Sequence, residues 1–419
     1  MWSWQRFHQL PRVVLFLCAA GLSGFAQNAP TERVSRDLRS ASPEFTELTP
    51  RGHTGPNPGT AARGIHGVDS LLNFSGQFQA PGVDGNGKKR KIWKYDMAGR
   101  PPQDGGTTII DAPIVPVSLD LLNYDGNGHT LHDSVVPFIL PTVYSPIFQS
   151  WNYSSSDVPT QIIDAELRAE FYNTMKPNWH TLLNPSVKTV RTMSLPAGSY
   201  YYELKRDGRC CEYVLVDSKV FGNLLFPPIP ADTTTPVGAA ENTGEITTKD
   251  IATFLFPNTY LYEGDPGNCC VLGFHSYDYE PGDASNGYAE KRYVLNYSSW
   301  ITPGLFGDGV EDVTATSHEL AESFNDPFVA SDSVHNLTPW WRSPNGNCQD
   351  DLEVGDAIEG LPMDVYAITM NGRTYHPQNV ALLQWFAFEA PSSALGGAYS
   401  YPDTGALTAL SPPQAVNCK

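Results

Sequence analysis

Residues 312–327 have the sequence DVTATSHELAESFNDP, and this stretch predicts the element on which the rest of the interpretation depends. Leu320 and Phe324 lie four residues apart, the spacing of an apolar stripe on a helix. Pro327 ends the pattern, because proline removes a backbone donor and does not continue a helix. We therefore expect one helix of about three turns that packs an apolar stripe against the rest of the protein.

Four polar side chains on this helix have the chemistry of a metal centre. His318 and Glu322 are four residues apart, so they project from one face as two metal ligands. Asp326 lies one further turn along and is the expected third ligand. Glu319 is placed to take a proton from metal-bound water, so we expect it to be the catalytic base. The set predicts one divalent ion, with zinc as first choice and manganese, iron or calcium as alternatives.

The string HELAE at 318–322 resembles the His-Glu-x-x-His helix of zincin metallopeptidases, with glutamate in place of the second histidine. The substitution weakens the case for zinc and is the reason that the other metals stay open. The resemblance implies a zincin-like α+β domain with a mixed sheet and an active-site helix.

Residues 317–327 also resemble a second family, the secreted bacterial relatives of the plant phosphate-induced, exordium-like proteins. A similar helix there is followed by a tryptophan-containing stretch and by a Glu-x-Gly-Asp segment. Two tryptophans at 340–341 and the segment from Glu353 to Asp356 stand at the matching places. By this resemblance Asp356, and after it Glu353, compete with Asp326 for the role of third ligand.

The N-terminus has the order of a secretory signal peptide. Arg6 and Arg12 precede a short apolar run at 13–22, and small residues end at Ala26. The apolar run is too short to span a bilayer, so we expect residues 1–26 to be removed and no membrane anchor to remain. The protein should be secreted or periplasmic.

Charge excludes one class of partner. Loss of residues 1–26 leaves 25 basic and 45 acidic residues, a net charge of −20. Such a surface repels a phosphate backbone, so we expect no nucleic-acid partner. The sequence does not indicate an oligomeric state.

Six cysteines remain after the signal peptide, and an even number in an exported chain predicts disulfides. The two Cys-Cys doublets lack the spacing of a zinc site, so we interpret them as structural. The six are Cys210, Cys211, Cys269, Cys270, Cys348 and Cys418.

Composition divides the mature chain in two. Residues 27–105 are rich in Pro, Gly, Ser, Thr and Asn, which is typical of a loose leader or propeptide. Residues 106–419 carry the periodic patterns of an α+β domain. These patterns predict a strand at 109–122, a helix at 161–175, hairpins at 200–217 and 363–378, and strands at 269–279 and 292–300.

The function that these features favour is metal-dependent hydrolysis of peptide bonds in a peptide or protein substrate. An edge strand at 292–300 would align an extended substrate. The alternative is a secreted, non-catalytic binding or signalling module of exordium-like type that keeps the helix as a structural or vestigial metal site. His275, His335 and His376 fit packing or surface roles better than ligand roles.

Overall fold

The computed structural model describes residues 71–81, 90–153, 158–204, 211–282, 284, 288, 290–307, 309–329, 341–346, 348–349, 352–391 and 395–410. The expected signal peptide at 1–26 and residues 27–70 of the expected leader lie outside the described residues.

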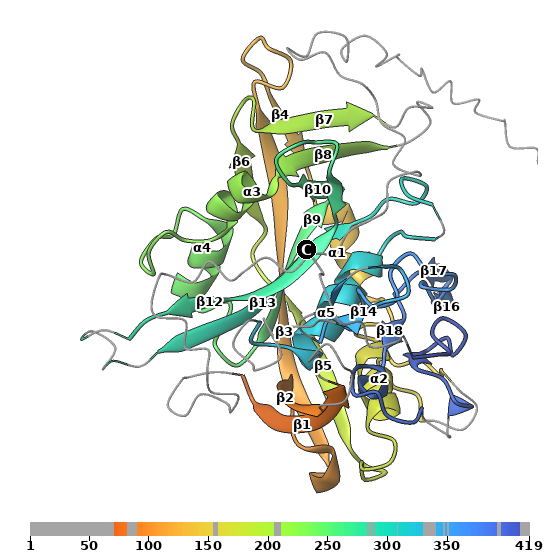
Figure 1. The fold of residues 1–419 in the computed structure, drawn as a ribbon. Helices are drawn as coiled ribbons and strands as arrows, with labels where there is room; N and C mark the ends of the chain where they lie inside the picture. The colour runs from red at the N-terminus through yellow and green to blue at the C-terminus, as the bar shows by residue number, and fades with distance from the viewer. Residues whose placement is uncertain are drawn as a thin grey trace, which may run out of the picture.

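A mixed seven-stranded sheet forms the centre of the molecule (Figure 1). Its order is β12-β13-β9-β3-β4, and β5 and β6 also pair with β3. The outer strands β12 and β4 run antiparallel to their neighbours, whereas β13, β9 and β3 are parallel to one another. This sheet and its helices confirm the α+β class. The strands are β3 (Thr107–Leu122), β4 (Thr130–Asp133), β5 (His180–Val187), β6 (Arg191–Leu195), β9 (Ile251–Pro257), β12 (Gly273–Glu280) and β13 (Lys291–Trp300).

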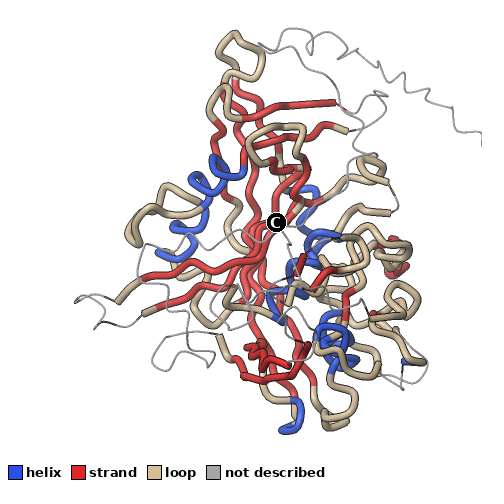
Figure 2. Tube along the Cα trace, viewed as in Figure 1, coloured by secondary structure: helices blue, strands red, loops and turns tan. Residues whose placement is uncertain are grey.

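Helices cover both faces of the sheet (Figure 2). Alternation along β13 makes this possible: Val294 packs in one core with Leu320, and Leu295 packs in the other core with Phe221. On the first face lie α1 (Val136–Val143), α2 (Ile162–Glu170) and α5 (Thr314–Asn325), and on the second lie α3 (Ser218–Leu225) and α4 (Pro236–Asn242). The helix expected at 312–327 is thus α5, and the one expected at 161–175 ends earlier, at Glu170.

A second sheet and several small hairpins complete the described fold. The four-stranded sheet has the order β11-β10-β8-β7, and the antiparallel pair β7–β8 confirms the hairpin expected at 200–217. The pair β16–β17 confirms the hairpin expected at 363–378, with positive φ at Asn371 and Gly372. The elements are β7 (Tyr200–Leu204), β8 (Glu212–Asp217), β10 (Thr259–Tyr262), β11 (Cys269–Val271), β14 (Trp341–Arg342), β15 (Cys348–Gln349), β16 (Ile368–Met370), β17 (Arg373–Tyr375), β18 (Val380–Ala381), α6 (Leu383–Phe386), β19 (Ser400–Tyr401) and the 3-10 helix η3 (Pro102–Asp104).

The N-terminal boundary of the domain lies earlier than composition predicts. β1 (Asn73–Pro81) and β2 (Arg90–Ala98) form an antiparallel hairpin. Phe74 and Met97 are buried in the core that contains α5. The expectation of a loose segment is therefore wrong for residues 71–81 and 90–105. Loop-forming residues dominate the composition there, but the few apolar ones recur at strand spacing and provide the buried face.

The strand at 292–300 is not an edge strand. It corresponds to β13, which pairs with β12 on one side and with β9 on the other. The sequence does not distinguish the two cases, because a strand buried on both faces has the same apolar pattern at an edge or in the centre. The edge strand beside α5 is β12.

Cysteine pairing is described for part of the chain. Cys269 and Cys270 form a disulfide with each other, and Cys211 is also disulfide-bonded. Cys210, Cys418 and the side chain of Cys348 lie outside the described residues.

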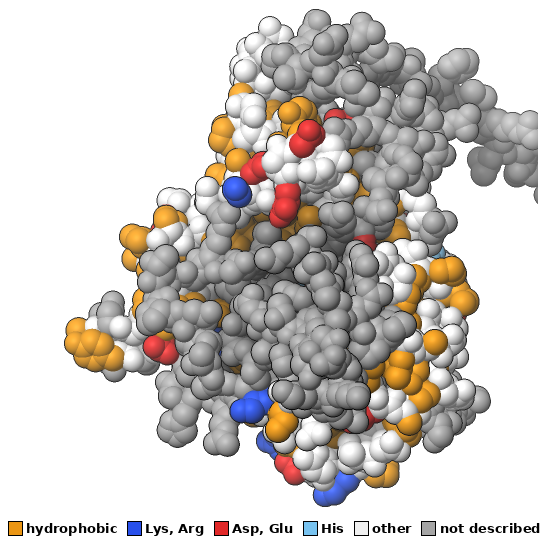
Figure 3. Space-filling model, viewed as in Figure 1, with side chains coloured by type: hydrophobic (Ala, Val, Ile, Leu, Met, Phe, Trp, Pro, Cys, Tyr) orange, Lys and Arg blue, Asp and Glu red, His pale blue; other side chains and the backbone are white. Residues whose placement is uncertain are grey.

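Two further features concern the distribution of basic side chains on the surface and the length of the helices. On the face drawn in Figure 3, the lysine and arginine side chains of the described residues are scattered and form no continuous basic patch. None of the described helices is long and apolar enough to cross a membrane.

Candidate metal centre

The helix α5 is buried along its whole length, unlike a surface helix with one solvated face. All of its residues are buried, and it packs against β12 and β13. His318, Glu319 and Glu322 are each at most 1% exposed. Charged groups in such surroundings need a partner of opposite charge, so their neighbours decide what the site can do.

Gln378 fixes the orientation of the His318 ring. Nδ1 of His318 lies 2.9 Å from Gln378 Oε1, and since an amide oxygen only accepts, Nδ1 is the donor. Gln378 is itself held at two points. Its backbone N–H donates to Ser317 Oγ at 2.9 Å, and its side-chain amide donates to Gly355 O at 3.0 Å. In the neutral ring, the other nitrogen, Nε2, therefore presents a lone pair, which is the state that binds a metal.

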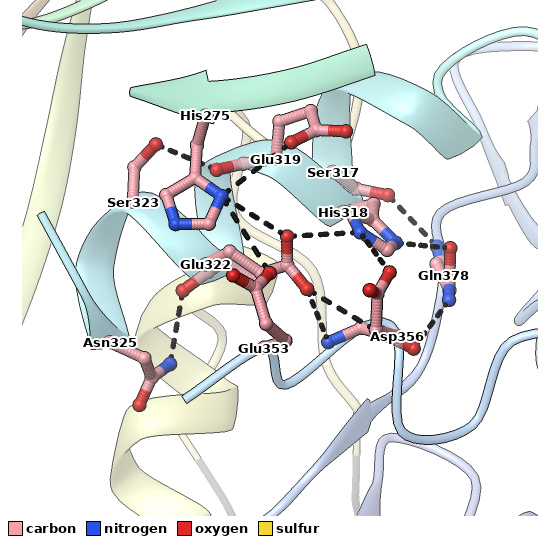
Figure 4. A network of polar contacts seen from close by, with 12 residues as sticks. His275, Ser317, His318, Glu319, Glu322, Ser323, Asn325, Glu353, Asp356 and Gln378 are labelled. Carbon is pink, nitrogen blue, oxygen red and sulfur yellow. Dashed lines mark hydrogen bonds and ion pairs between the residues drawn. The ribbon is translucent and has the colours of Figure 1, made fainter. Parts of the chain in front are cut away.

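The Glu322 carboxylate lies between two imidazoles (Figure 4). Its Oε2 is 3.0 Å from His318 Nε2 and 3.3 Å from His275 Nδ1. Its Oε1 accepts the backbone N–H groups of Gly355 and Asp356, at 3.0 and 3.3 Å. These backbone bonds anchor one oxygen and leave the other directed into the cluster.

The turn at 352–360 adds two acidic side chains to the cluster. Asp356 Oδ1 lies 3.3 Å from His318 Nε2, and Glu353 Oε2 lies 3.9 Å from His275 Nδ1. The two residues that the exordium-like resemblance suggested as alternative ligands therefore both reach the site. Asp356, with a side chain 16% exposed, is the more accessible of the two.

Two glycines leave room for the functional side chains of α5. A β-carbon at Gly273, the first residue of β12, would clash with the Glu319 carboxylate. A β-carbon at Gly355 would clash with the His318 ring. Both positions therefore require the absence of a side chain for steric reasons.

Asp326 does not join the other predicted ligands. Helix α5 ends at Asn325, and Asp326 leaves the helical conformation with φ −144° and ψ 69°. The helical position assumed for Asp326 is therefore not formed, because the helix ends one residue before it. The convergent groups of ligand atoms among the described residues do not include Asp326, whereas Asp356 contacts Nε2 of His318.

His275 is the site residue that sequence reasoning missed. It comes from β12, is 1% exposed, and neither ring nitrogen has a hydrogen-bond partner within the described part of the chain. Its Nδ1 faces carboxylates, with Glu319 Oε2 at 3.8 Å. A lone histidine in a strand carries no local pattern, so only the fold reveals its position.

Burial and mutual charge set the pKa values in the cluster. Burial raises the pKa of Glu319 well above its usual value and raises that of Asp356 to about 6. Burial opposes protonation of His318, but Glu322 and Glu319 outweigh it and raise the His318 pKa. Burial acts to raise the Glu322 pKa, but the charge of His318 and the contact with His275 bring it below its usual value. The cluster therefore depends on bound protons or on a cation for charge compensation.

The donor set fits a divalent metal ion. Among the described residues, three groups have ligand atoms within 4.8 Å of one another, and two of them lie at this centre: His318 with Glu319 and Glu322, and His275 with Glu322 and Glu353. One imidazole with carboxylate oxygens is a common ligand set for zinc, manganese or iron.

His376 belongs to a different group. Its Nδ1 contacts Asp312 at 2.8 Å and Glu311 at 3.1 Å, and its backbone N–H also donates to Asp312. These contacts attach the 376–378 segment to the residues that precede α5, so we interpret them as structural. His335 lies outside the described residues.

Comparison with known proteins supplies no relative: no family model, no curated protein and no solved structure matches this chain.

Proposed function

We propose that the protein is a metal-dependent hydrolase whose centre is formed by His318, Glu322 and Asp356. The observation that carries the proposal is the His318 ring: Gln378 holds its Nδ1, and its Nε2 faces the carboxylates of Glu322 and Asp356. A divalent ion bound there would acidify a water molecule and polarise a scissile carbonyl.

Glu319 acts as the base in this proposal. Its carboxylate lies in the same group of ligand atoms as His318 and Glu322. A carboxylate in this group of ligand atoms reaches a water molecule held at the centre and accepts its proton. Gly273 supports this role because it leaves the space that the Glu319 side chain fills.

Peptide bonds are the substrate class that the position of the centre favours. β12 is the edge strand next to α5, and it carries His275. An extended peptide binds to a sheet edge through main-chain hydrogen bonds, which would bring a scissile bond beside the centre. Asp356 marks the side from which the centre is accessible.

Deep burial favours a second candidate, a secreted binding or signalling module with a structural metal site. Every residue of β12 is buried, as are His318, Glu319 and Glu322. A structural site is closed, whereas a catalytic one keeps an open position for water and substrate.

The substitution Glu319→Gln separates the two candidates. Glutamine keeps the shape and hydrogen bonding of the Glu319 side chain but cannot act as a base. We therefore expect peptide hydrolysis to fall by about two orders of magnitude or more, with the metal content unchanged. Cleavage of a peptide library by mass spectrometry and metal analysis provide the two readouts. Glu212→Gln, at an exposed position in β8, is the matched control.

The possible results are distinct. A Glu319→Gln variant that cleaves as well as the wild type contradicts the catalytic role. A wild type that holds metal and cleaves no peptide in the library supports the structural site instead.

A further inference from the structure

The two groups of ligand atoms share one residue, Glu322. One group adds His318 and Glu319, and the other adds His275 and Glu353. The shared atom is Glu322 Oε2, with His318 Nε2 at 3.0 Å and His275 Nδ1 at 3.3 Å (Figure 4). The two histidines come from different elements and approach this carboxylate from different directions.

The surroundings of the His275 ring indicate a bound cation in addition to an ion at His318. The ring is 99% buried, and both of its nitrogens are without a hydrogen-bond partner among the described residues. Its Nδ1 is directed at Glu319, Glu322 and Glu353, at 3.8, 3.3 and 3.9 Å. A buried imidazole that faces several carboxylates requires a proton or a cation between them.

The net charge of the cluster also indicates two divalent ions. Four carboxylates, those of Glu319, Glu322, Glu353 and Asp356, surround two imidazoles. With neutral histidines and ionised acids the cluster has a charge of about −4, which one divalent ion halves and two divalent ions neutralise.

We propose that the centre holds two divalent ions bridged by the Glu322 carboxylate, the second of them bound by His275, Glu322 and Glu353. This inference rests on the metal site of the proposed function. Carboxylate-bridged pairs in hydrolases are typically about 3.5–4 Å apart. One histidine per ion with several carboxylate oxygens favours Mn²⁺ or Fe²⁺ over Zn²⁺.

The experiment counts ions. The purified full chain is loaded with MnCl₂, dialysed against metal-free buffer and examined by metal analysis and by electron paramagnetic resonance. We expect two Mn²⁺ per chain and a spectrum of two exchange-coupled ions. His275→Ala should retain one uncoupled Mn²⁺ with the fold intact by circular dichroism. His132→Ala, which removes an exposed histidine that contacts Asp120, should still hold two.

Each other outcome is decisive. One Mn²⁺ in the wild type overturns the second ion and leaves the proposed hydrolase standing. One Mn²⁺ that disappears in His275→Ala shows a single ion shared by both histidines. Two ions in His275→Ala place the second ion elsewhere. A wild type without Mn²⁺, and without Zn²⁺ or Fe²⁺ in parallel loadings, overturns the proposed function as well.

Discussion

Gln378 determines which nitrogen of His318 faces the carboxylates of the candidate centre, although it lies 60 residues further along the chain. An amide that accepts from Nδ1 holds both the tautomer and the ring orientation. Partners of this kind are worth roughly 10–100-fold in metal affinity.

At the residue scale we predict that Gln378→Leu weakens metal binding by about 10–100-fold, because the His318 ring loses its hydrogen-bond acceptor. Competition against a chromogenic chelator measures the affinity. Gln384→Leu is the control: its side chain also donates to a backbone carbonyl, that of Glu170, but away from the centre. Equal affinities for the wild type and Gln378→Leu would contradict the positioning role.

The residues that sequence reasoning finds are those with local spacing. His318, Glu319 and Glu322 lie within one helical turn, so their shared region follows from the sequence alone. His275 and Gln378 come from other elements, and no pattern around either residue indicates a ligand or its partner. The prediction for Asp326 differs, because it placed this residue on the ligand face of a helix that ends at Asn325.

At the element scale, α2 buries more acid than a helix of its length normally does. Glu166 and Glu170 lie one turn apart and are both buried. Burial raises both pKa values well above the usual value, and the charge of Glu170 adds to the effect on Glu166. Because the folded chain holds protons that the unfolded chain releases, folding stability falls as the pH rises above about 4.5.

We predict that Glu170→Gln leaves stability unchanged at pH 4 and increases it at pH 8, by about 1–3 kcal/mol. Glutamine has the shape of the protonated acid and needs no proton. Urea unfolding at the two pH values gives the comparison.

Glu245→Gln is the control of opposite sign. Burial acts to raise the Glu245 pKa, but the hydrogen bond from Thr189 and the charge of Arg191 outweigh burial and lower it. Its ionised form therefore adds stability above pH 4.5, which the variant should lose at pH 8. A Glu170→Gln variant with the same stability change at both pH values would contradict the assignment.

Elements with strong periodicity follow from the sequence, and those with weak periodicity do not. β3 and the turn at Asn371-Gly372 are predictable because β-branched runs and a glycine turn have local causes. The β1–β2 hairpin is hidden by its composition. The place of β13 inside the sheet depends on pairing with distant strands, which no local pattern encodes.

At the scale of the whole molecule, the N-terminal hairpin is part of the core. Phe74 contacts Phe171 with ring centroids 5.9 Å apart, and β2 contacts α5. We predict that a chain of residues 106–419 is less stable than one of residues 71–419 by at least about 3 kcal/mol, because a buried aromatic is lost. Urea unfolding of the two chains measures the difference. Equal unfolding midpoints would show that the hairpin does not stabilise the core and would support the interpretation of this segment as a leader.

The long strand β3 has a consequence for how the molecule assembles. It pairs with β4, β5, β6 and β9, so the sheet closes through contacts between distant parts of the chain. Such non-local pairing makes folding slow. Every residue of the candidate centre comes from position 275 or later, after most of the sheet has been synthesised. Metal uptake should therefore be a late event, and its rate during refolding should report the final docking of α5 and the 352–360 turn onto a sheet that is already in place.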